Sequence, residues 1–215
     1  MTSPASESLK EIHLRLDARI QSVDEPRWLS SRYAAPTKRI TLIILYAFYY
    51  ELARVRLVVT DETMGNIRFQ WWRDALDELA EGKTRQHDVV LALAEEIEQA
   101  HLHVADLLPL IDQYEAAFLN HDRDAEPEDR LLLIAAKILD PEAELSPALK
   151  TLALDWAKLR RGNGVQDFAS FQHVSTKFRP ASAHFRVRRI WARKREPSAL
   201  EMRMSILMAM ITGRV

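Results

Sequence analysis

The sequence predicts an all-α fold built as a single domain over residues 1–215, and three observations support this. Only five of the 215 residues are glycine. Apolar residues recur every three or four positions over long stretches, and strict alternation of apolar and polar residues is rare. The first spacing places apolar side chains on one face of a helix, whereas alternation is typical of strands. A chain of this length buries about 70% of its unfolded surface and needs no disulfide to be stable.

The individual elements follow from this spacing and from residues that start or stop helices. Residues 37–59 are apolar nearly all round in their first half, which is typical of a central, buried helix. Thr60 or Asp61 can cap the next helix, and Gly82 can end it. A short helical turn and loop are expected before residue 37. The expected helices are 8–23, 37–59, 64–80, 88–105, 107–120, 129–139, 146–160, 181–195 and 198–211.

The last expected helix holds four of the six methionines of the chain. Leu200, Met204, Leu207 and Ile211 fall on one stripe, which favours a helix that closes the core. Methionine also suits adaptable contacts, so a membrane surface or a partner protein is the alternative for this helix.

Composition excludes several classes of function. The chain has no cysteine, which rules out thiol catalysis, cysteine-ligated zinc and iron–sulfur clusters. The most apolar run, ITLIILYAFYY, has eleven residues, whereas a membrane-spanning helix needs about 20. The first twenty residues contain no apolar core of signal-peptide length. We therefore expect a cytoplasmic protein.

Charge is distributed unevenly along the chain. Residues 1–157 hold 17 Lys and Arg against 28 Asp and Glu, whereas residues 158–215 hold 13 against 3. Most of the excess lies in the basic tract 158–195, from Lys158 to Arg195. This tract could meet anionic lipid, a diphosphate or an acidic partner, or it could be a solvated face that balances the acidic half. No nucleic-acid partner is expected.

The two central helices carry the candidate site. Phe69, Trp72, Leu76 and Leu79 form a stripe that faces a core. Glu51 and Arg54 lie one turn apart and could form a simple ion pair. If their helix is buried, these charges need partners or a ligand. The candidate residues for an anion site or a cavity lining are Glu51, Arg54, Arg56, Arg68, Gln70 and Trp72.

The segment LYAFYYELARVRLVVTDETMGNIRFQWWRDALDEL resembles part of the squalene/phytoene synthase family. It is most similar to a divergent branch that includes a mitochondrial assembly factor of respiratory complex I and bacterial relatives. The resemblance implies a helical domain of the isoprenoid synthase type. The residues that carry it are Phe48, Glu51, Leu52, Ala53, Val55, Gly65, Arg68, Gln70, Trp71, Trp72 and Arg73.

Active members of this family join two prenyl diphosphates and bind Mg²⁺ through two motifs that resemble Asp-x-x-x-Asp. The first motif of the family falls on Ala53, Arg54 and Leu57 of this chain. The second falls near Asp155 and Asp167, which are too far apart in the sequence. Since arginine and aliphatic side chains cannot ligate magnesium, the resemblance implies that Mg²⁺-dependent prenyl transfer has been lost.

The leading hypothesis from the sequence is therefore a non-catalytic assembly or accessory factor of the respiratory complex I type, with no catalytic residue, metal or cofactor. It would contact respiratory-complex subunits, or the inner membrane as a peripheral protein, through the basic tract. Two alternatives remain open. One is a prenyl-diphosphate transferase with an altered site, which would use Mg²⁺. The other is a module that binds a prenyl or lipid ligand.

Overall fold

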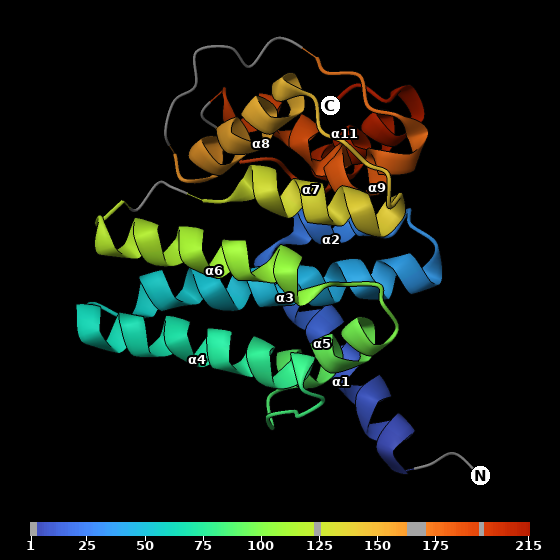
Figure 1. Ribbon diagram of the computed structural model, residues 1–215. Coiled ribbons are helices and arrows are strands. Elements are labelled where there is room, and N and C mark those ends of the chain that lie inside the picture. The colour runs from blue at the N-terminus through green and yellow to red at the C-terminus, as the bar shows by residue number, and fades with distance from the viewer. Residues whose placement is uncertain (1–3, 123–125, 163–170, 194–195) are drawn as a thin grey trace. The chain divides into compact units, whose positions relative to one another are not determined.

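The computed structural model describes residues 4–122, 126–162, 171–193 and 196–215 (Figure 1). Within these ranges the regular structure is α-helical apart from two short 3-10 segments and an isolated bridge between His173 and Arg214. The prediction of an all-α fold is confirmed. The helices divide into two compact units, which we describe separately. That the whole chain forms a single domain stays a prediction.

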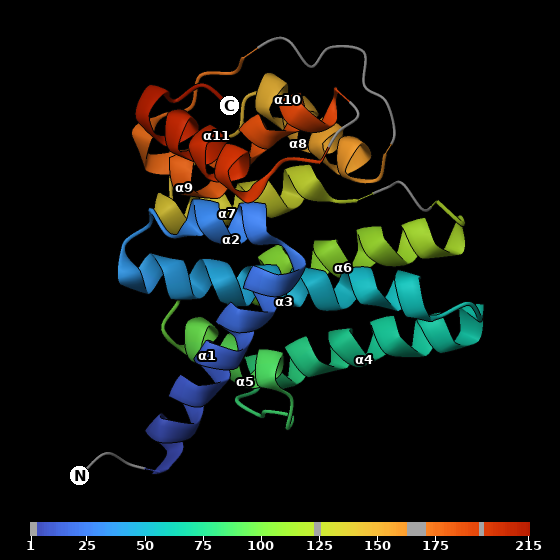
Figure 2. The same ribbon diagram turned by 180° about the vertical axis from the view of Figure 1, so that it is seen from behind.

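The first unit comprises residues 1–23 and 40–123. Its helices are α1 (Pro4–Val23), most of α3 (Pro36–Val58), α4 (Glu62–Ala80), α5 (Asp88–Glu98) and α6 (Val104–Leu119). Helix α3 runs alongside α4 and α6 (Figures 1 and 2). Its residues 41–49 are all buried, which confirms the expected central helix.

Aromatic pairs join the three long helices of this unit. Phe48 of α3 packs edge-to-face on Trp72 of α4, with ring centroids 5.3 Å apart. Tyr49 of α3 packs on Tyr114 of α6 at 5.1 Å. Gly65 of α4 lies so close to α6 that a Cβ atom at this position would overlap the ring of Phe118. The stripe predicted on α4 faces the core, as expected. Because Gly65 has no side chain, α4 can approach α6 closely.

The ends of α4 follow the residues that the sequence indicated. Asp61 caps α4 by accepting a hydrogen bond from the Met64 amide at 2.9 Å, and Gly82 adopts a φ of +78° after its last turn. The predicted helix 88–105 is wrong in its second half. Helix α5 ends at Glu98, because Ala100 takes a positive φ of 56° that breaks the helix, and α6 begins at Val104.

The second unit comprises residues 24–39 and 124–215. Its helices are α2 (Glu25–Ser31), α7 (Glu128–Leu139), α8 (Pro147–Arg160), α9 (Arg179–Ser182), α10 (Arg188–Trp191) and α11 (Ala199–Thr212). The predicted helix 181–195 is wrong as one element, since α9, the 3-10 segment Ala183–Val187 and α10 replace it. This broken path folds His184, Phe185 and Trp191 around the buried Trp156 of α8.

Helix α11 turns a different face inward from the one predicted. Ile206 and Ala209 are its buried residues, whereas Leu200, Met204 and Ile211 are 48–70% exposed. The helix is apolar on nearly every side, so its periodicity did not determine which face packs on the unit. The predicted stripe is therefore an exposed apolar row.

Candidate functional site

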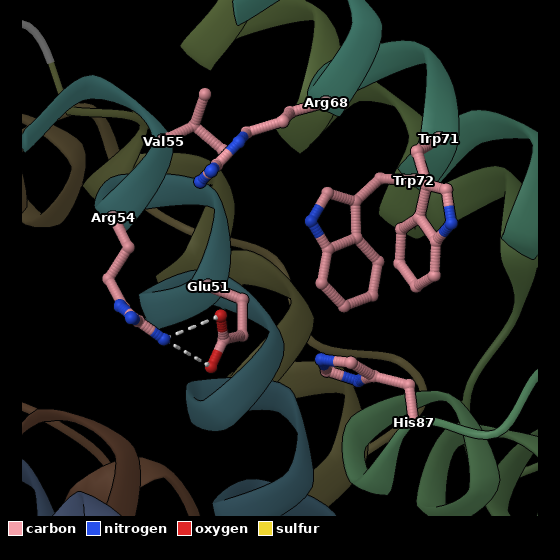
Figure 3. A pocket seen from close by; sticks show the side chains of 7 residues that line it. All are labelled: Glu51, Arg54, Val55, Arg68, Trp71, Trp72 and His87. Atoms are coloured by element: carbon pink, nitrogen blue, oxygen red, sulfur yellow. Dashed lines mark hydrogen bonds and ion pairs between the residues drawn. The ribbon is translucent and has the colours of Figure 1, made fainter. Parts of the chain in front are cut away.

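A pocket of about 260 Å³ opens in the first unit between α3, α4 and the residue that precedes α5 (Figure 3). Helix α3 contributes a carboxylate, a guanidinium and one aliphatic side chain. Helix α4 contributes a guanidinium and two indole rings, and the start of α5 contributes an imidazole. The lining residues are Glu51, Arg54, Val55, Arg68, Trp71, Trp72 and His87.

The aromatic wall of the pocket is fixed by mutual packing. Trp72 is buried against Phe48, and the Trp71 ring lies 4.9 Å from that of Trp72. The His87 ring packs on both indoles, at 5.6 and 5.3 Å. Its Nδ1 accepts a hydrogen bond from the Val89 amide at 3.3 Å and so caps α5. The other ring nitrogen points toward the pocket, where it can donate to a ligand (Figure 3).

Arginines surround the carboxylate of the pocket. Arg19 of α1 donates to Glu51 at 2.6 Å, and Arg54 donates to Glu51 at 3.2 Å from the next turn of α3. Arg68 reaches toward the same side from α4, and no ion pair of Arg68 is found among the residues that the structure describes. Positive charge therefore exceeds negative charge around this pocket, an arrangement that favours an anion.

The structure brings together Glu51, Arg54, Arg68 and Trp72 but not the other two candidate residues. Arg56 lies over the Tyr114 ring at 5.3 Å, and its guanidinium donates to the carbonyl of Asp122 at 3.4 Å. Gln70 is exposed and donates to Asp74 at 2.7 Å. Neither residue lines the pocket.

Three lining residues were not among the candidates. Trp71 was visible in the sequence, because it lies one turn from Arg68 on the same face of α4. Val55 adjoins Arg54, and its side chain closes the wall between the two arginines (Figure 3). His87 follows a loop after α4, so no local spacing could place it at the pocket.

The lining does not fit the Mg²⁺ that active members of the resembled family bind. A magnesium ion takes carboxylate oxygens, and both oxygens of Glu51 already accept from arginine. Nowhere in the described ranges do three or more His, Cys, Asp or Glu side chains gather in a way that could hold a metal ion. The second expected position for a motif includes Asp155, on α8, and Asp167, which lies outside the described residues.

The basic tract 158–195 supplies charges to the interior of the second unit. Arg160 donates to the buried Asp24 at 2.7 Å. Asp24 also pairs with Arg27, which in turn bonds Glu128 at 2.6 and 2.9 Å. Arg161 pairs with Glu126. Residues 163–170 and 194–195 of the tract lie outside the described residues, and its contact with a partner or a membrane stays a prediction.

Burial and pairing act in opposite directions on these acids. Burial disfavours the ionised form of Asp24, but the charges of Arg160 and Arg27 outweigh this effect and lower its pKa. For Glu128, burial dominates and raises the pKa to about 7, although Arg27 acts against this shift. Burial, together with the charges of Arg27 and Arg160, lowers the pKa of His184 well below its ordinary value.

Comparisons with known proteins place these observations in a family. A sequence model of squalene/phytoene synthase matches residues 20–131, slightly more than half of the chain, including every residue that lines the pocket. No curated protein and no solved structure gave a match. Within the described ranges, no helix is both long enough and apolar enough to cross a bilayer. The matched region and the all-α architecture agree, and the chain belongs to the squalene/phytoene synthase family.

Proposed function

We propose that this chain is a non-catalytic member of the squalene/phytoene synthase family and acts as an accessory factor of the respiratory complex I assembly type. The observation that carries the proposal is that both carboxylate oxygens of Glu51 accept hydrogen bonds from arginine. This carboxylate lies two residues before Ala53, the first position on which the metal-binding motif of the family falls, and arginines from α1 and from the next turn of α3 hold it.

The chemistry of prenyl transfer explains why this arrangement speaks against catalysis. A diphosphate can leave only if its developing charge is stabilised, and divalent metal ions do this in active members of the family. Guanidinium groups near Glu51 repel such an ion and occupy the oxygens that would bind it. The pocket therefore supports binding of an anion without its activation.

Several residues that resemble the assembly-factor branch pack the first unit, and others line the pocket. Phe48 and Trp72 form one aromatic pair, and Leu52 and Val55 are buried on α3. Gly65 permits the close approach of α4 to α6. The packing contacts of these residues support a role in which the surface of the protein, and not a reaction, is the functional output.

Two measurements test this proposal. Deletion of the gene in the source cell should lower the amount of assembled complex I, and the wild-type gene should restore it. Purified protein with farnesyl or geranylgeranyl diphosphate and Mg²⁺ should release no pyrophosphate. Normal complex I in the deletion strain would remove the assembly role, and Mg²⁺-dependent pyrophosphate release would establish the enzyme alternative.

The pocket favours a second function, the binding of an amphipathic anion such as a prenyl or lipid phosphate. Two indoles offer an apolar wall, and Arg54 and Arg68 offer charge beside it. A ligand at one hundred times its dissociation constant should stabilise the protein by about 2.7 kcal/mol. Native mass spectrometry of the purified protein should detect a co-purified lipid. Bare protein together with no thermal shift by farnesyl diphosphate would exclude this function.

A further inference from the structure

Five large apolar side chains are exposed at one end of the first unit. They lie at the end of α3, the start of α4 and the end of α6, and they are 41–69% exposed. Figures 1 and 2 show these three helix ends next to one another. We call this surface the apolar tip; it consists of Leu57, Val58, Met64, Ile67 and Leu119.

Contacts within the first unit hold the three helix ends together. Glu62 at the start of α4 pairs with His121, just after α6, at 3.4 Å. Arg56 near the end of α3 reaches the carbonyl of Asp122 at 3.4 Å. Phe69 of α4 packs on Phe118 of α6 at 5.9 Å. The apolar tip is therefore a defined surface, and its side chains stay outside the core that forms beneath it.

The apolar tip continues directly into the arginine side of the pocket. On α3, Arg54 and Val58 are four residues apart and share a face, and on α4 Met64 and Arg68 do the same. The two helices run in opposite directions, so both arginines lie behind the tip. Four residues of helix rise about 6 Å, which places each guanidinium roughly one turn behind the apolar side chains.

We propose that the apolar tip docks on a membrane surface that contains anionic phospholipids. Apolar side chains of surface-bound proteins enter the boundary between headgroups and acyl chains by about 5–10 Å. At that depth, Arg54 and Arg68 lie at the level of the lipid phosphates, where each adds electrostatic attraction. Trp71, on the same face of α4, has the amphipathic ring that is enriched at membrane interfaces.

Three acids at the tip set how strongly this surface prefers anionic lipid. One carboxylate oxygen of Asp61 accepts the capping hydrogen bond of α4, and Glu62 faces His121. Asp122, the residue after His121, is exposed. All three lower the local positive charge. Removal of the Glu62 charge should therefore strengthen binding to anionic vesicles, an effect opposite to that of removing an arginine.

The exposed apolar row on α11 is the other surface that could enter a membrane. Arg203, the one arginine within α11, lies 3.9 Å from Glu25, and Arg214 follows the helix. Arg179 is turned inward, where it donates to the carbonyl of Met210 at 2.7 Å. Within α11 itself no two arginines lie one turn behind the row, so the apolar tip fits an anionic surface better.

Vesicle flotation with the full-length protein tests the proposal. Vesicles of phosphatidylcholine alone are compared with vesicles of equal parts phosphatidylcholine and phosphatidylglycerol. Wild type should bind the anionic vesicles and bind the neutral ones far more weakly. The double variant Leu57→Glu/Ile67→Glu should lose more than tenfold in affinity, because it removes two apolar side chains from the boundary and places two negative charges against anionic lipid.

Two single variants are matched controls, because their leucines are as exposed as Leu57. Leu14→Glu changes a residue that is 62% exposed on α1, and Leu200→Glu changes one that is 70% exposed on α11. Both should bind vesicles like wild type. Loss of binding in Leu200→Glu with unchanged binding in the double variant would overturn the proposal in favour of α11.

The arginines give a second readout that does not disturb the apolar surface. Arg68→Ala should weaken binding to anionic vesicles about fivefold, and Glu62→Gln should strengthen it. Circular dichroism and thermal unfolding verify that each variant is folded. Equal binding to neutral and anionic vesicles overturns the proposal. So does stabilisation by inorganic phosphate without vesicle binding, which would indicate a site for small anions only.

Discussion

The two units of the protein use arginine in opposite ways. In the second unit, the Arg27 side chain is 3% exposed and lies between the carboxylates of Asp24 and Glu128. In the first unit, the Arg54 side chain is 45% exposed at the mouth of a pocket and shares Glu51 with Arg19. Arg27 makes internal ion pairs, whereas Arg54 retains N–H donors that face solvent.

This difference separates arginines that maintain a fold from arginines that can serve a ligand. A buried guanidinium needs acids as partners, because an unpaired charge is costly in a medium of low polarity. Removal of the guanidinium takes that partner away from the acids. An exposed guanidinium contributes little to stability and keeps its capacity to bind. The basic tract looks like one surface in the sequence, yet Arg160 and Arg161 pair with the largely buried carboxylates of Asp24 and Glu126.

The largest effect should come from Arg27→Met. The substitution keeps much of the side-chain volume but leaves Asp24 and Glu128 buried without this partner, and it should lower the free energy of unfolding by about 3–5 kcal/mol. Arg54→Met in the first unit should cost no more than about 1 kcal/mol. Urea unfolding of both variants measures the contrast. Equal losses would contradict the distinction between the two units.

Gly65→Ala tests whether the first unit depends on close apolar packing. Alanine is the better helix former by about 1 kcal/mol, but its Cβ would overlap the Phe118 ring. We expect a net destabilisation of about 1–3 kcal/mol. Thermal and urea unfolding check this. The double variant Gly65→Ala/Phe118→Leu should recover part of the loss, and a stable single variant would show that α6 can move away.

His184→Phe should change how the stability of the protein depends on pH. Both ring nitrogens of His184 are buried, and neither has a hydrogen-bond partner among the described residues. Because its pKa is lowered in the fold, the unfolded chain binds the extra proton first as pH falls below 6.5. Wild type should then lose stability relative to His184→Phe by up to about 1.4 kcal/mol per pH unit.

Glu128 affects the same pH range with the opposite sign. Its pKa is raised from an ordinary 4.5 to about 7, so the folded state binds more protons between these values and stability falls as pH rises. The difference between wild type and His184→Phe, measured by urea unfolding at several pH values, isolates the histidine. A pH-independent difference would mean that His184 gains its proton in the folded state as readily as in the unfolded chain.

The smallest effect on stability should be that of Arg68→Ala, within about 0.5 kcal/mol. Its effect on binding should be larger. If the pocket takes amphipathic anions, this variant loses the thermal shift produced by farnesyl diphosphate. Arg56→Ala is the matched control on α3, because Arg56 does not line the pocket, and it should keep the shift. Equal loss in both variants would place the ligand elsewhere.

Periodicity and capping residues predicted the first unit better than the second. The stripe on α4 and the cap at Asp61 followed from local rules. The end of α5 depends on a positive φ at Ala100, and an alanine does not indicate such a conformation in the sequence. On α11, apolar residues surround the helix, so only packing decides that Ile206 faces inward. The path from α9 to α10 is likewise set by packing around Trp156.

The candidate site was predictable where its residues share one helix face. Glu51 and Arg54 are three residues apart and meet at the pocket. Arg56 is two residues beyond Arg54, a spacing that turns its side chain to another face of α3. His87 reaches the pocket only through the fold, because the loop after α4 returns the chain to the tryptophans.

The double role of His87 ties the pocket to the backbone of the next helix. The same ring that packs on the two indoles accepts the hydrogen bond of the Val89 amide. Motion of the ring away from the pocket must release that amide to water. Hydrogen exchange at Val89 therefore serves as an internal reporter of occupancy: any molecule that holds the imidazole against Trp72 slows exchange at a single, assignable backbone position.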